Sequence, residues 1–155
     1  MSTGAAVGTA LVDPGAVVRW GLPLVTVLAN LASAATIGAF AAAAFLIGPS
    51  AERAWRGAVA VGQVAAIIWA LAAVLHVIFG YASVWGRPLT AENFGTELLT
   101  FIRGTELGTN YFWAAALAVL VSLFAVATGG MTMAMWTTAL GVIALVPVAL
   151  TGHAA

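Results

Sequence analysis

Three long stretches of the chain contain no charged residue, and no other feature limits the possible folds so strongly. They are residues 20–51, 57–86 and 107–155. Each is longer than the ~20 residues that an α-helix needs to cross the hydrocarbon core of a bilayer. In lipid every backbone amide must be paired internally, so a spanning segment is a helix or a strand of a closed barrel. Barrel strands alternate polar and apolar residues, which these stretches do not. The sequence therefore predicts an all-α integral membrane protein.

Composition excludes several classes of function. Only 6% of the 155 residues are charged, against roughly 25% in soluble domains. The chain has no cysteine, which excludes disulfides and thiolate metal sites. Its five arginines are scattered and the net charge is zero, so we expect no nucleic-acid partner. No catalytic triad or phosphate-binding loop is recognisable, and we expect no enzymatic activity.

Turn residues divide the chain into a bundle of four predicted transmembrane helices. Gly48 and Pro49 end the first, and Gly129 and Gly130 separate the last two. Pro147 should bend the fourth helix near its end, because proline has no N–H to donate. We expect the whole chain, 1–155, to be a single membrane domain with helices at about 17–47, 55–80, 111–128 and 131–151.

The connection between the second and third helices contains an amphipathic segment. Residues 91–103 place apolar side chains on one helical face, with charged residues and threonines on the opposite face. This pattern predicts an interfacial helix that lies on the membrane surface or packs across the end of the bundle. We expect the carboxylates of this connection to be solvated; they belong to Glu92, Glu97 and Glu106.

Arginines indicate the orientation. The short loop after the first helix holds Arg53 and Arg56, whereas the arginines of the longer connection stand among three glutamates. The positive-inside rule then places the short loop in the cytoplasm and both termini outside. A stripe of small residues, Ala34, Gly38 and Ala42, would let another helix approach closely, so we expect the lipid bilayer and other membrane subunits as partners.

Four residues are candidate metal ligands. His76 near the outer end of the second helix and His153 after the fourth lie at the same predicted face, and neutral imidazole is the commonest metal ligand. Met131 and Met135 share one helical face, and thioether sulfur selects Cu(I). Each pair has a plainer interpretation, since histidine can be a hydrogen-bond partner and methionine a packing residue. Polar residues elsewhere in the helices are expected to form interhelical hydrogen bonds; these are Asn30, Ser33, Thr36 and Gln63.

Three motifs resemble those of one family. Residues 12–16 (VDPGA) with 19–23 (RWGLP), residues 105–108 (TELG) and residues 150–155 (LTGHAA) occur in this order along the chain. They are similar to the CopD-type copper-transport domain that many bacteria fuse to a CtaG-type cytochrome c oxidase assembly domain. Within these motifs, His153 is the position that the resemblance offers as a copper ligand.

The resemblance implies a copper-handling protein of the bacterial inner membrane, linked to copper supply for cytochrome c oxidase assembly. Copper would be its cargo, and its partner would be cytochrome c oxidase or the remainder of a CopD/CtaG-type protein. Two other interpretations stay open. One is an accessory transmembrane subunit on a respiratory complex that binds no metal. The other, weaker one is a small haem-binding membrane cytochrome that uses His76 and His153.

Overall fold

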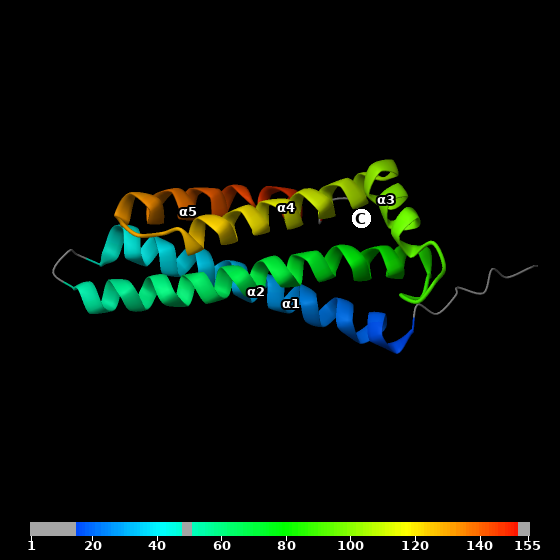
Figure 1. Cartoon of the computed structure of the whole chain (residues 1–155), viewed down its shortest axis with the longest axis horizontal. Coiled ribbons are helices and arrows are strands. Elements are labelled where there is room, and N and C mark those ends of the chain that lie inside the picture. Colours follow the sequence, from blue (N-terminus) through cyan, green and yellow to red (C-terminus); the bar gives the residue numbers. More distant parts are fainter. Residues whose placement is uncertain (1–14, 48–50, 152–155) are drawn as a thin grey trace, which may run out of the picture.

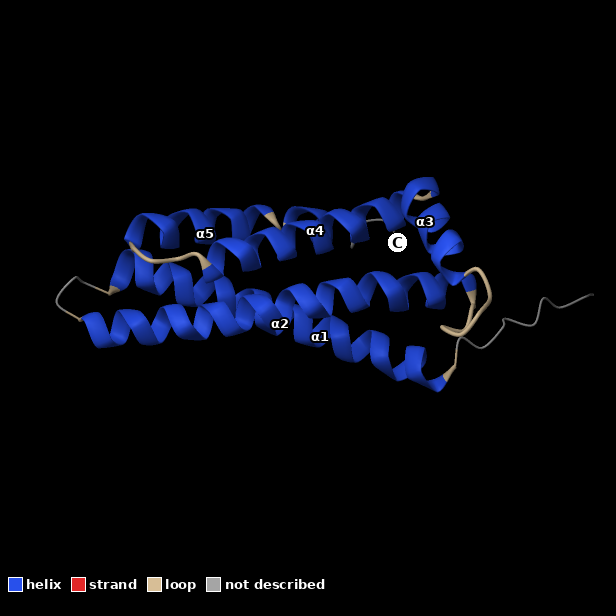
Figure 2. Ribbon diagram, viewed as in Figure 1, coloured by secondary structure: helices blue, strands red, loops and turns tan. Residues whose placement is uncertain are grey.

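The described part of the chain is helical. The computed structural model describes residues 15–47 and 51–151, and within these ranges it contains helices and no strands (Figures 1 and 2). Four helical segments are long and apolar enough to span a membrane: Ala16–Leu46, Glu52–Trp85, Glu106–Val126 and Met131–Ala149. This confirms the predicted all-α class and the four spans.

The first two spans are longer than the others. Helix α1 covers Ala16–Ala41 and continues as a short π-helix, η1, over Ala42–Leu46. Helix α2 covers Glu52–Trp85, so it extends beyond Gly80, where the sequence suggested that it would end. Gly80 stays helical, and the helix instead stops at Gly86, whose backbone is left-handed with φ 61°. A glycine in this conformation is a common helix terminator.

A short helix folds across one end of the bundle. Helix α3 covers Phe94–Gly104 and lies across the ends of α2 and α4 (Figure 1). It begins three residues later than the sequence suggested, because Asn93 has a left-handed backbone with φ 67° that breaks the preceding turn. The apolar face of α3 packs on the bundle, with Phe101 fully buried. Its opposite face, including Thr96 and Thr100, is exposed.

The last two spans complete the bundle. Helix α4 covers Glu106–Val126, and its first turn is capped by Thr105, whose hydroxyl accepts from the Gly108 amide. Helix α5 covers Met131–Ile143 and α6 covers Val146–Thr151. The fourth span is thus interrupted near its end, as Pro147 predicted, because proline cannot donate to the Ile143 carbonyl one turn earlier. The spans form a ring in which α1 contacts α2, α2 contacts α4, α4 contacts α5 and α6, and α5 contacts α1.

Glycines set how closely these helices approach. A Cβ atom on any of four glycines would lie within 3 Å of a large side chain on the neighbouring helix. The pairs are Gly21–Phe79, Gly62–Phe40, Gly80–Tyr111 and Gly141–Ile37. Two of them join α1 to α2 near opposite ends, so this contact is fixed along its length.

The outer surface of the bundle is apolar. Large side chains such as Leu24, Leu71 and Leu123 are exposed on different spans, which is what lipid requires. The stripe of small residues also faces outward: Ala34 and Gly38 are exposed, and a Cβ on Gly38 would meet nothing within 4 Å. Gly38 therefore makes no close contact within the described chain, and use of the stripe by a partner stays a prediction.

We predict that Gly62→Leu destabilises the bundle and that Gly38→Leu does not. At Gly62 the new side chain collides with the buried Phe40 ring, 2.7 Å from the position of Cβ, and overpacking of this kind costs about 1–3 kcal/mol. At Gly38 there is open space. Unfolding in mixed detergent micelles, followed by the helical circular dichroism signal, measures both variants. Equal stability of the two would contradict the proposed close approach of α1 and α2.

Candidate functional site: a polar cavity within the bundle

A cavity of about 80 Å³ lies between the spans, in the half of the bundle that α3 covers. Its walls come from α1, α2, α4 and the junction between α5 and α6. The lining is mostly apolar but includes six polar residues: Thr26, Asn30, Ser33, His76, Asn110 and Tyr111. A single water occupies roughly 10–15 Å³ on this measure, whereas pockets for drug-sized ligands have roughly 300–1,000 Å³. The cavity therefore has room for an ion or a few waters and does not favour haem.

His76 is the only titratable group with a ligand nitrogen among the described residues that line the cavity. Its Nδ1 lies 3.1 Å from the Thr26 hydroxyl of α1. The same hydroxyl is 2.8 Å from the Leu22 carbonyl, to which it donates. The imidazole ring also packs edge-on against the ring of Tyr111, with 4.7 Å between ring centroids. Two neighbouring helices thus hold the ring in one orientation.

His76 lies deeper in the bundle than the sequence suggested. The expected helix end at Gly80 would have placed it only about one turn below the interface. Because α2 continues to Trp85, nine residues separate His76 from the helix end, which corresponds to ~14 Å at 1.5 Å per residue. A polar side chain inside a candidate membrane span is a functional candidate by default, since burial in the membrane is costly.

The two candidate methionines lie far from His76. His153 lies outside the described residues. Met131 and Met135 are on the first turns of α5, at the end of the bundle opposite α3 (Figure 1), and each is 39% exposed. Within residues 15–47 and 51–151, no three His, Cys, Asp or Glu side chains are close enough to hold a metal ion together.

The polar residues of the helices differ from expectation. Of the four expected to bridge helices, Gln63 does so, donating from Nε2 to the Ala125 carbonyl at the end of α4. Ser33 and Thr36 instead donate to carbonyls of their own helix. Thr26 was not among the predicted residues, yet its hydroxyl is the group that contacts Nδ1 of His76. Its position four residues before Asn30, on the same face of α1, was the available signal.

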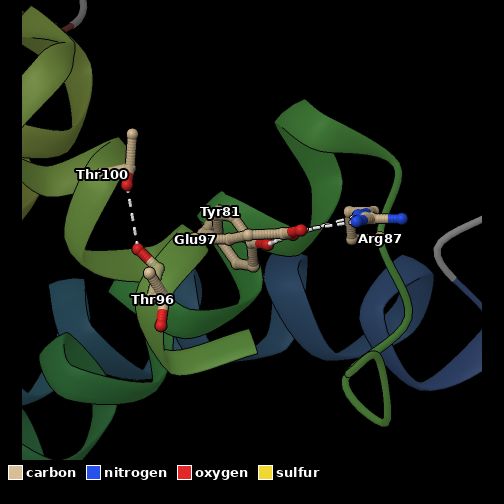
Figure 3. Close-up of polar contacts among 5 residues, drawn as sticks. All are labelled: Tyr81, Arg87, Thr96, Glu97 and Thr100. Carbon is tan, nitrogen blue, oxygen red and sulfur yellow. Dashed lines mark hydrogen bonds and ion pairs between the residues drawn. The ribbon is translucent and has the colours of Figure 1, made fainter. Parts of the chain in front are cut away.

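Glu97 is not the solvated carboxylate that the sequence suggested. Its side chain is only 22% exposed and binds two residues of the α2 end (Figure 3). The Tyr81 hydroxyl donates to Oε2 at 2.6 Å. Arg87 donates to both carboxylate oxygens, through Nε to Oε2 at 3.0 Å and through Nη2 to Oε1. These hydrogen bonds, that of Arg87 first, lower the pKa of Glu97 from 4.5 to about 2. The ion pair therefore fastens α3 to the end of α2.

The corner between α3 and α4 explains the TELG motif. The Thr105 hydroxyl donates to the Phe101 carbonyl at 2.8 Å and accepts from the Gly108 amide at 2.9 Å. A Cβ on Gly108 would lie 2.3 Å from the Phe101 carbonyl oxygen. Threonine and glycine at this spacing therefore set the sharp turn that brings α3 over the cavity half of the bundle.

Fold and site together define a multi-pass helical membrane protein with a small polar cavity around one histidine. Residues 13–155 match the family described as copper resistance protein D-like, N-terminal domain. The match covers most of the chain, which therefore belongs to this family of copper-resistance and copper-transport proteins. The resemblance found in the sequence motifs is thus confirmed. Comparisons with curated proteins and with solved structures gave no match.

We predict that Glu97→Gln loosens α3, whereas Glu92→Gln, at an exposed position, does not. Because the Glu97 pKa is about 2 in the fold against 4.5 ordinarily, its carboxylate stabilises the docked helix at neutral pH. That stabilisation is lost as the pH falls from about 4.5 towards 2. Protection of residues 94–104 from hydrogen exchange, taken relative to the intrinsic exchange rate at the same pH, should fall in Glu97→Gln at pH 7, and in the parent chain only on acidification. Identical exchange in both variants at pH 7 would contradict the role of the ion pair.

Proposed function

We propose that this chain moves or holds copper within the bacterial inner membrane, with copper as its cargo. One observation carries the proposal: a histidine within the second candidate membrane span, held by Thr26, lines a cavity with room for an ion. Imidazole is a suitable ligand for copper. Membership of the copper resistance protein D-like family supports copper as the metal.

One histidine does not complete a copper site. We propose that His153 supplies a second nitrogen, as its place in the LTGHAA motif suggests. Pro147 and Val148, which precede His153 by a few residues in the sequence, line the cavity. Met131 and Met135, at the opposite end of the bundle, would form a separate transient thioether site.

The finer role is copper supply to cytochrome c oxidase assembly. It rests on the similarity of the motifs to CopD-type domains that are fused to CtaG-type assembly domains. The competing role, an accessory subunit on a respiratory complex, draws support from the outward face of α1, where Ala34 and Gly38 are exposed. Close packing between small residues stabilises helix pairs in lipid, so this face could bind a partner helix. The two roles can be told apart because only the first requires bound metal.

We also propose that the loop end of the bundle, with Arg53 and Arg56, faces the cytoplasm. Arginine number alone does not decide this, because Arg19, Arg87 and Arg103 lie at the other end. The two ends of the bundle differ in how far glutamates offset the arginines. At the α3 end, three described arginines stand with three glutamates, and Glu97 pairs directly with Arg87. At the loop end two arginines stand with Glu52 alone, which leaves a charge of +1.

Copper content distinguishes the proposed ligands. We predict that His76→Gln weakens copper binding at least about tenfold, since even supporting residues of metal sites contribute 10–100-fold to affinity, and that it thereby lowers the copper-to-protein ratio of the purified chain. A double change, Met131→Leu with Met135→Leu, keeps volume and should have a smaller effect. Elemental analysis after purification from copper-supplemented cells gives the ratio. A parent chain without copper would contradict the proposal and favour the accessory subunit.

Orientation can be read from single cysteines, since the chain has none of its own. We predict that cysteine at exposed Thr90 reacts with an impermeant maleimide added to intact cells. Cysteine at exposed Ala54 should react only after the membrane is opened. The reverse pattern would mean that the α3 end faces the cytoplasm.

A further inference from the structure

An apolar groove of about 500 Å³ lies between α2 and α4, next to α3. The described residues that line it are all apolar. They include Val74 and Ile78 of α2, Ile102 of α3, and Phe112, Ala116 and Val119 of α4. Several of these side chains are exposed on the outside of the bundle, so the groove opens towards the surrounding lipid. It shares no residue with the lining of the cavity around His76.

One positive charge stands at the α3 end of this groove. Arg103 lines a second hollow together with Ile102 and Phe112, which also belong to the groove wall. The arginine is exposed and forms no ion pair with another described residue. Glu106, three residues later, is exposed and does not pair with it. The groove therefore combines an apolar wall with a free guanidinium at one end.

The position of Arg103 along the bundle corresponds to the ends of the spans. Helix α2 ends at Trp85 and α4 begins at Glu106, and α3 lies across these ends (Figure 1). Trp113, in the second turn of α4, is exposed, and exposed tryptophan is typical of the membrane–water interface. A side chain at this level meets lipid head groups, whereas the groove extends towards the acyl chains.

We propose that an anionic phospholipid binds here, with its phosphate at Arg103 and one acyl chain in the groove. Arginine presents paired N–H donors that match phosphate oxygens, and basic pockets between membrane helices recur as sites for anionic head groups. From Phe112 to Val119 the groove follows α4 for ~10 Å at 1.5 Å per residue, so it holds the first part of the chain. This lipid site does not depend on copper handling.

A lipid bound in this way also stabilises the position of α3. Leu98 and Ile102 belong to the groove wall, so an acyl chain packs against the apolar side of α3. The ion pair of Glu97 with Arg87 fastens the same helix to α2. A ligand that binds the folded state stabilises it by mass action, so the lipid and the ion pair act together on α3.

Lipid retention tests the role of Arg103. Native mass spectrometry counts the lipids bound to the full chain after purification with equal amounts of phosphatidylglycerol and phosphatidylcholine that have identical acyl chains. We expect the chain to retain phosphatidylglycerol preferentially. Arg103→Gln should reduce this preference about fivefold, the contribution of one arginine near a membrane surface. Arg53→Gln should leave it unchanged, because Arg53 is also exposed and without an ion pair among the described residues, yet lines a hollow with Glu52 and Arg56.

Filling the groove tests the site of the acyl chain. Ala116→Phe places a ring within the groove and should lower the retention of both lipids. Leu123→Phe is the matched control, because Leu123 is exposed on the same face of α4, about two turns further along, and does not line the groove. Circular dichroism shows whether each variant is folded. Val119→Phe, at the exposed edge of the groove, replaces Ala116→Phe if that variant does not fold.

The outcomes separate the two parts of the inference. Equal retention of both lipids by the parent chain, or equal loss of preference in Arg103→Gln and Arg53→Gln, would overturn phosphate binding by Arg103. A folded groove-filling variant that retains as much lipid as Leu123→Phe would overturn the acyl-chain site. A parent chain that retains neither lipid would overturn both.

Discussion

Helices in lipid have no hydrophobic drive to associate, because lipid tails are as apolar as leucine side chains. The bundle must therefore be held by close packing and by a few hydrogen bonds. Glycines at helix contacts meet this need, since they let the rings of Phe79, Phe40 and Tyr111 lie directly against a neighbouring backbone. Gln63 adds a hydrogen bond across the bundle to the Ala125 carbonyl. Helix α3 packs on the end of this ring of spans.

Because the helices are otherwise tightly packed, a cavity between them marks a candidate site. Where glycine and aromatic residues meet, the helices leave no room between them, yet the region around His76 is hollow and partly polar. The interruption between α5 and α6 borders this region, because Leu145, Pro147 and Val148 line it. Interrupted helices at membrane depth are tolerated where they line a cavity, and they recur at the binding sites of transporters. The departure from ideal packing thus coincides with the candidate site.

Much of this fold could be predicted from the sequence, because the bilayer imposes simple rules. Uncharged stretches of sufficient length were expected to become spans, and Pro147 was expected to bend the last one near its end. The end of α2 was predicted wrongly at Gly80, because glycine is a helix terminator only where the backbone turns left-handed. That turn occurs at Gly86, while Gly80 serves packing against Tyr111. Periodicity does not distinguish these two uses of glycine.

The site was harder to predict, because it depends on contacts between distant parts of the chain. His76 was identified as a candidate from its polarity in an apolar helix. Its partner Thr26 is fifty residues away, and the sequence marks it only by its spacing of four residues from Asn30. Glu97 was expected to be solvated for the same reason, since its partners Arg87 and Tyr81 reach it only after the chain reverses between α2 and α3.

The two polar regions of the α3 half have opposite characters, and their separation is physically useful. At the end of the bundle Glu97 and Arg87 form an ion pair that fastens α3. Their opposite charges largely cancel. Below them, the cavity around His76 is lined by neutral groups. An unpaired carboxylate in that wall would hold a cation strongly and slow its release, whereas neutral ligands bind modestly. If the chain passes copper on, as proposed, a wall of neutral groups favours release of the ion more than a carboxylate would.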